Sequence, residues 1–182
     1  MRPGRVERLP DPVEAALPHL LRQVGAWCVR LGGRGVDPEE ATHEVLLILL
    51  RRRHDLRPGA PIEAWAYGVT RGVLRNHRRR AWLRRWVPGF VPDVADTRPD
   101  ALLELEVSER AGHVRAILAE MTEAHREVLV LCDVEERSRA EVAELLDVPE
   151  GTVKSRLRLA RARFRALGAE RGLKLDAEVD DE

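Results

Sequence analysis

The chain has 182 residues, of which 44% are hydrophobic and 34% charged, with 31 basic and 31 acidic side chains. This composition allows one or two compact domains with an apolar core, and no apolar run reaches the roughly 18 residues of a membrane-spanning helix. The start, MRPGRVERLPDP, lacks the apolar segment of a signal peptide. We therefore expect a cytoplasmic protein in which Cys28 and Cys132 are buried free thiols rather than a redox pair.

Charge is unevenly distributed along this neutral chain. Residues 21–86 carry 14 basic and 6 acidic side chains, residues 101–167 carry 11 and 13, and residues 168–182 carry 2 and 6. Such segregation favours an anionic partner that meets particular faces of the protein.

The periodicity of the sequence is helical. Apolar residues recur at spacings of three and four, and strand-like alternation is nowhere sustained, so we predict an all-α fold. The segment VPGFVPDVADTRPD, residues 87–100, contains three prolines and predicts an extended linker. Two small helical domains are therefore expected at residues 10–86 and 101–167, followed by an acidic tail over residues 168–182.

A strong helix start opens the segment DPEEATHEVLLILLRRR, residues 37–53. Asp37 can cap the helix, Pro38 suits its first turn, and Glu40 lies at the capping-box position. The helix is then apolar on nearly every side. It must therefore be buried on two sides or bind a partner, and core burial alone is the simpler of the two explanations.

A loop over residues 54–61 leads to a long helix predicted over residues 62–85, IEAWAYGVTRGVLRNHRRRAWLRR. Its expected core stripe consists of Ile62, Trp65, Ala66, Val69 and Val73. Seven arginines lie on other faces against a single acid, and Tyr67 and Trp82 lie among them. A solvated face is the ordinary explanation, whereas cations interleaved with aromatic rings are typical of phosphate neutralisation with base stacking.

Four further helices are predicted at residues 102–119, 123–134, 138–146 and 150–167. Ser138 with Glu141 forms a second capping-box pattern. A short turn ending at Pro149 separates the last two helices. A short helix, a tight turn and a longer basic helix indicate a helix-turn-helix.

The last of these helices begins with GTVKSRLRLARARF, residues 151–164, which holds five basic residues and no acid. On a helical wheel its apolar stripe consists of Val153, Leu157, Ala160 and Phe164. A parallel basic stripe, about 100° away, consists of Lys154, Arg158, Arg161 and Arg165. Thr152 and Ser155 lie near the helix start, where a recognition helix meets base edges. The pattern favours DNA binding over an ordinary surface helix, which usually mixes charges of both signs.

These residues resemble a known family. LDVPEGTVKSRLRLARARF, preceded by HREVLVLCDVEERSRAEVAELL, is similar to region 4 of the bacterial sigma-70 family, and in particular to its small extracytoplasmic-function group, which keeps only regions 2 and 4. DPEEATHEVLLILLRR resembles the polymerase-binding helix of region 2, and AWAYGVTRGVLRNHRRR resembles its promoter-melting helix. The resemblance covers roughly residues 20–167.

The resemblance implies a sigma factor that directs promoter-specific initiation without catalysing a reaction and without a cofactor or metal. Its implied partners are the RNA polymerase core, through the β′ clamp helices and the β flap, promoter DNA, and an anti-sigma factor. The linker would thread toward the RNA exit channel between the two DNA-binding domains.

The resemblance also implies three sets of contact residues. Those for polymerase binding are Glu44, Val45, Ile48, Leu49 and Arg52. Those for the −10 promoter element are Arg71, Arg75, Asn76, Arg78 and Arg79. Those for the −35 element are Thr152, Lys154, Ser155, Arg156, Arg158 and Arg161, the last as a phosphate contact.

Some positions depart from the family pattern. His43 stands where glutamine is usual, Gly72 where asparagine is usual, and Asn76 where aspartate is usual. Gly72 would serve close packing or weaken its helix, since glycine costs about 1 kcal/mol in a helix relative to alanine. Glu136 replaces a usual glycine and Arg139 a usual aromatic residue, which leaves the turn geometry before the helix-turn-helix open.

Two rival functions remain open at this point. One is a helix-turn-helix regulator whose first domain senses a signal or dimerises. The other is an adaptor that binds polymerase or an anti-sigma protein without reading DNA. An enzyme is disfavoured, because the six histidines are scattered without metal-ligand spacing and the sequence has no Gly-rich phosphate loop or nucleophile motif.

Overall fold

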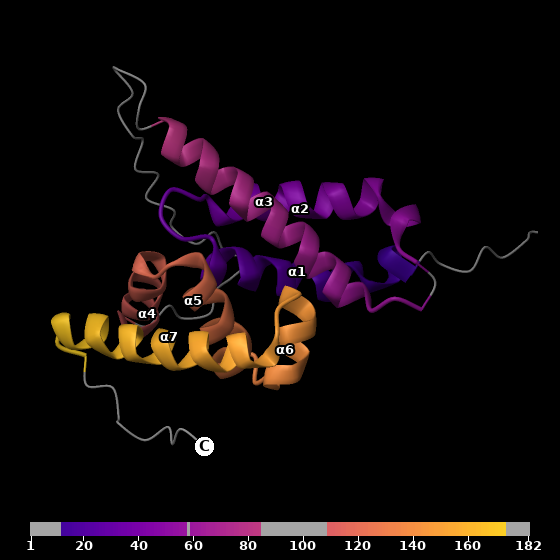
Figure 1. Ribbon diagram of the computed structural model, residues 1–182. Coiled ribbons are helices and arrows are strands. Elements are labelled where there is room, and N and C mark those ends of the chain that lie inside the picture. Colours follow the sequence, from indigo (N-terminus) through magenta and orange to yellow (C-terminus); the bar gives the residue numbers. More distant parts are fainter. Residues whose placement is uncertain (1–11, 58, 85–108, 174–182) are drawn as a thin grey trace, which may run out of the picture.

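The computed structural model describes residues 12–57, 59–84 and 109–173. Every regular element in these three stretches is a helix, and the helices form two groups that pack side by side (Figure 1). This confirms the predicted all-α fold. The predicted linker, residues 87–100, and the last part of the predicted acidic tail lie outside the described residues.

The first group comprises α1 (Pro12–Leu31), α2 (Pro38–Arg51), the short 3-10 helix η1 (Arg53–Asp55) and α3 (Ile62–Arg84). Helix α1 is its centre and packs against both α2 and α3. The buried face of α1 follows the helical period through Leu20, Val24, Trp27 and Leu31.

Helix α2 starts as expected from its sequence. The Asp37 carboxylate accepts hydrogen bonds from the backbone amides of Glu39 (2.9 Å) and Glu40 (3.1 Å), and Pro38 occupies the first turn. The Glu40 side chain, however, lies 3.9 Å from the ring of His77 on α3. The cap of α2 therefore comes from Asp37.

The core stripe of α3 differs from the prediction. Ala66 and Val73 are buried as expected, whereas Ile62, Trp65 and Val69 are only partly buried. The most buried positions also include Tyr67, Thr70, Leu74 and His77. The placement of Tyr67 among the surface charges was wrong, because its ring packs edge-on against Trp27 at 5.1 Å between ring centroids.

The second group comprises α4 (Glu109–Glu120), α5 (Glu123–Leu129), a π-helix η3 (Val130–Val134), α6 (Arg139–Leu146) and α7 (Glu150–Glu170). Ser138 and Glu141 form the predicted capping box at α6. Val153, Leu157 and Ala160 are buried and Phe164 packs against them, which confirms the apolar stripe of α7. Helix α7 also runs three residues beyond its predicted end.

The two groups share one apolar core, because α1 of the first group contacts α4 and α5 of the second. Trp27 on α1 is fully buried, and its indole N–H donates a 2.5 Å hydrogen bond to the carboxylate of Glu135. In the part of the chain that the structure describes, no helix is long and apolar enough to cross a membrane.

Candidate nucleic-acid and polymerase interfaces

Helix α7 presents a polar face opposite its buried stripe. Lys154, Ser155 and Arg158 are exposed, whereas Thr152 and Arg156 are half-buried. The Ser155 hydroxyl donates a 3.0 Å hydrogen bond to the carbonyl of Thr152. One side of α7 is thus held in the core while the side near its N-terminus is free to enter a DNA groove.

A groove of about 700 Å³ lies along this face. The −35 candidates Lys154, Ser155, Arg158 and Arg161 line it from α7. Arg137 and Arg139 line it from the segment that leads into α6. Sequence reasoning missed these two arginines as contact candidates, although they flank Ser138, the first residue of the capping box.

Arg161 is held against η3 by an ion pair. Its guanidinium makes two hydrogen bonds to the carboxylate of Asp133, at 2.8 and 3.1 Å, and the side chain is 21% exposed. Asp133 belongs to the π-helix η3, so this contact ties α7 to η3. A DNA phosphate would have to compete with Asp133 for Arg161.

The basic face of α3 separates into two parts. Arg75, Asn76 and Arg79 are exposed. Arg71 and Arg78 instead reach across to α5, where they form ion pairs with Glu127 and Glu123. The Arg71 side chain stays 39% exposed in its ion pair, whereas that of Arg78 is 20% exposed.

The predicted polymerase-binding residues of α2 fall on different faces. Val45 and Leu49 are fully buried, so they support the helix from the core. Ile48 is half-buried, and Arg52 at the helix end pairs with Asp55 at 2.7 Å. Leu47 is 51% exposed and was not singled out in the sequence. The surface of α2 that remains available to a partner therefore centres on Leu47 and Ile48.

Glu44, the fifth of these residues, faces α3. Its carboxylate lies 2.9 Å from Nε2 of His77 and 3.8 Å from the guanidinium of Arg80. His77 is only 3% exposed. This partly buried pair links the candidate polymerase helix to the candidate −10 helix, and the scattered histidines of the sequence did not predict it.

The departures from the family pattern have different structural outcomes. At Gly72 an added Cβ would meet no atom of the described residues within 4 Å, so close packing does not explain this glycine. Glu136 adopts φ 54°, the left-handed conformation that a glycine adopts without strain. The turn before α6 thus has a backbone geometry typical of glycine, although the residue at this position is a glutamate.

Both cysteines are free thiols, as expected. Cys28 is buried, and desolvation raises its pKa to about 11. Cys132 is only partly buried and lines the groove beside α7. No group of His, Cys, Asp and Glu side chains within the three described stretches is arranged to hold a metal ion.

The helix-turn-helix with its basic groove, joined to a second helical group with a basic helix, defines a class of two-domain DNA-binding protein. Residues 18–84 match the family model of sigma-70 region 2, and residues 112–164 match that of sigma-70, region 4. The chain belongs to the sigma-70 family, in its extracytoplasmic-function (ECF) group.

The sequence similarity to known sigma factors extends over most of the chain. The ECF RNA polymerase sigma factor EcfG of Rhodopseudomonas palustris is 27% identical over 162 residues, which cover 88% of this chain and 85% of EcfG. SigE of Mycolicibacterium smegmatis is 29% identical over 84% of this chain and 62% of SigE. SigM of Mycobacterium tuberculosis is 30% identical over 72% of this chain and 64% of SigM.

Two solved structures share the fold. The sigma factor RpoE from Bartonella quintana, in complex with the anti-sigma factor NepR, superposes with a TM-score of 0.66 at 19% identity and covers 87% of this chain and 97% of RpoE. CnrH in complex with the cytosolic domain of CnrY gives a TM-score of 0.59 at 19% identity, with 86% of this chain and 89% of CnrH covered.

Proposed function

We propose that this ECF sigma factor binds polymerase and promoter DNA through two domains, at residues 10–86 and 101–167, which contact different promoter elements. The first binds RNA polymerase core through α2 and contacts the −10 element through α3, and the second reads the −35 element through α7. The observation that carries this proposal is the two-sided character of α7, whose apolar stripe is buried while Lys154, Ser155 and Arg158 line an open groove.

The two ends of α7 would have different roles at the −35 element. Side chains near the start of a recognition helix meet base edges, and cations flanking it position the helix on the phosphates. Thr152, Ser155, Arg156 and Arg158 lie within the first nine residues of α7. Arg139, which faces them across the groove, is placed to contact a phosphate.

At the −10 element the protein would act by binding. A base that leaves the duplex must be captured by a pocket and stacking surfaces, while cations hold the displaced strand. Arg75, Asn76 and Arg79 offer the exposed polar groups of α3, and Trp82 near its end is 56% exposed. Polymerase supplies the chemistry, so the chain itself acts as a binding factor and not as an enzyme.

Partners and location follow from this function. Polymerase core, contacted at the β′ clamp helices and the β flap, and promoter DNA are the primary partners, and both place the protein in the cytoplasm. RpoE was solved with the anti-sigma factor NepR. We infer that an anti-sigma factor also acts on this chain. A regulator with a sensing first domain is not favoured, because residues 18–84 match sigma-70 region 2.

Transcription in vitro with core polymerase over a genomic promoter pool tests the proposal. Replacing Arg156 and Arg158 with alanine should reduce −35-dependent initiation about tenfold or more, since one good base contact contributes about 1–3 kcal/mol. Replacing Arg22 on α1 and Arg163 on α7, two exposed arginines outside the basic stripe, is the matched control. Equal losses in both variants, or failure of the wild-type chain to bind core polymerase, would contradict the proposal.

A further inference from the structure

One large apolar side chain on α7 faces away from the core. Leu159 is 47% exposed, whereas Leu157 and Ala160 are buried. The apolar stripe of α7 is complete without Leu159, because Val153, Leu157 and Ala160 already pack into the core. Packing within the fold therefore does not explain a leucine at this position.

The surroundings of Leu159 are basic. Lys154 and Arg158 are exposed, and Arg156 is half-buried. The sequence of α7 contains no acidic residue between Glu150 and Glu170. A cationic face of this kind attracts nucleic acid and repels a basic partner. An exposed leucine among these cations therefore fits a partner that carries both phosphates and apolar groups.

Leu159 lies on the same side of α7 as Ser155. The two residues are four positions apart, so their side chains lie about 40° apart around the helix axis and about 6 Å apart along it. Ser155 is exposed and lines the groove beside α7. Helix α7 packs mainly against α4, α5 and α6, at the outer side of the second group (Figure 1). A DNA groove that admits Ser155 would therefore also meet Leu159.

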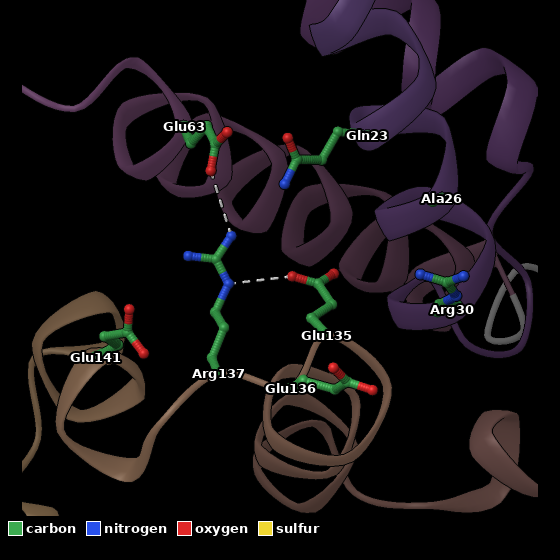
Figure 2. A pocket seen from close by; sticks show the side chains of 8 residues that line it. All are labelled: Gln23, Ala26, Arg30, Glu63, Glu135, Glu136, Arg137 and Glu141. Carbon is green, nitrogen blue, oxygen red and sulfur yellow. Dashed lines mark hydrogen bonds and ion pairs between the residues drawn. The ribbon is translucent and has the colours of Figure 1, made fainter.

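Two arginines near this face are already held by carboxylates. Figure 2 shows Arg137, directly before α6, between Glu63 and Glu135, at distances of 3.5 and 3.2 Å. Arg161 is held by Asp133. The side chains best placed to reach a base are therefore exposed ones in the first ten residues of α7: Lys154, Ser155, Arg158 and Leu159.

The chemistry of a leucine side chain limits what it can recognise in DNA. Leucine has no hydrogen-bonding group in its side chain, so it cannot read the donors and acceptors of a base edge. The apolar group that the major groove offers is the C5-methyl of thymine. Contact between this methyl and a leucine removes apolar surface of both from water. A leucine in the major groove therefore favours thymine over the other bases.

We propose that Leu159 is a specificity-determining residue that selects a thymine in the −35 element through contact with its C5-methyl group. The inference rests on the proposed role of α7 at the −35 element, and it names a base that the helix selects. Arg156 and Arg158 supply polar contacts to the same element. Leu159 adds a contact that does not depend on charge.

Removing one methyl group from the DNA tests this proposal. Holoenzyme is reconstituted from core polymerase and the full chain, on a linear promoter recovered from the genomic pool. Each thymine of the −35 element, on either strand, is replaced in turn by deoxyuridine, which lacks only the C5-methyl. We expect one replacement to raise the holoenzyme concentration for half-maximal abortive initiation about fourfold, which corresponds to about 0.8 kcal/mol for one buried methyl group.

Substitution of the leucine should abolish the effect of that methyl group. L159A should weaken initiation on the thymine promoter at least about fourfold, and deoxyuridine at the sensitive position should then cause no further loss. L159M keeps a large apolar side chain and should retain the sensitivity to deoxyuridine. If the effects of L159A and deoxyuridine multiply at every position, or if the selected promoters share no thymine in the −35 element, the proposal is refuted.

The matched control is L21A, because Leu21 is 48% exposed but lies on α1. It should change neither the half-maximal concentration nor the sensitivity to deoxyuridine. Titration of core polymerase without DNA tests the other class of partner. If L159A weakens this binding, Leu159 contacts polymerase instead of thymine and the proposal is wrong. Circular dichroism checks that the variants keep their helices.

The R156A/R158A variant separates this inference from the proposed function of α7. If that variant reduces −35-dependent initiation while no thymine methyl is coupled to Leu159, only the inference fails. If it leaves initiation unchanged, α7 does not read the −35 element, and the proposed function fails together with the inference.

Discussion

Glu136 illustrates how a single residue can depart from a family pattern without changing the backbone. It adopts φ 54° in the turn before α6, as Asp147 does in the turn after it. Aspartate tolerates the left-handed region because its short side chain can bond locally, whereas a longer side chain has no such compensation. The turn at Glu136 is therefore a strained position.

Replacing Glu136 with glycine should raise the free energy of unfolding by about 0.5–1 kcal/mol. The left-handed conformation costs about 1–2 kcal/mol with a Cβ, and part of the gain is lost to the greater freedom of glycine in the unfolded chain. Urea unfolding measures the change. Glu136→Ala, which removes the carboxylate but keeps the Cβ, should show no such gain, and equal stabilities of the two variants would rule out backbone strain.

At the scale of elements, α2 shows what a helical wheel leaves open. Its sequence is apolar nearly all round, which was compatible with core burial or with a docking surface. The structure divides the helix between the two, because Val45 and Leu49 are fully buried and Leu47 is 51% exposed. An exposed leucine on the helix that resembles the polymerase-binding element is the clearest candidate for a docking contact.

Leu47→Asp should weaken binding to core polymerase about tenfold or more, since burying a leucine contributes about 1.5–3 kcal/mol. Biolayer interferometry with immobilised core enzyme measures the affinity. Leu21→Asp on α1 is the matched control, because Leu21 is 48% exposed on another helix. An equal effect of both substitutions would place the docking surface elsewhere or show a general loss of fold.

At the scale of the whole molecule, Glu127 makes the free energy of unfolding depend on pH. Desolvation raises the pKa of its carboxyl in the folded chain above the ordinary value of 4.5. The folded state then binds the proton more tightly than the unfolded state. This contribution to the free energy of unfolding is therefore largest at low pH and is lost as the pH rises through the folded pKa.

Glu127→Gln removes this titration, so its stability relative to wild type should improve as the pH rises from about 4 to about 7. Urea unfolding of both proteins at the two pH values measures the difference. Glu144→Gln, on the exposed face of α6, serves as the control. A difference that stays constant or moves the other way would contradict the burial of an ionised Glu127 between the two groups.

Much of this protein is determined by local sequence. Periods of three and four predicted α2, α3, α6 and α7, although the sequence analysis did not predict the central helix α1. Asp37 and Ser138 predicted two helix starts, and Val153, Leu157 and Ala160 predicted the inner face of α7. Family membership could also be predicted from the sequence, since the helix-turn-helix motif is continuous in the chain. These features depend on neighbours within one or two helical turns, where spacing alone sets direction.

Only the tertiary structure decided which charges are available. Arg71 and Glu127 are 56 residues apart in sequence, so no local pattern could pair them. The same holds for Tyr67, which leaves the basic face because Trp27 of α1 covers it. A helical wheel gives the direction of a side chain relative to its own helix axis. Whether that side chain is buried or ion-paired depends on which residues of the neighbouring helices lie on that side.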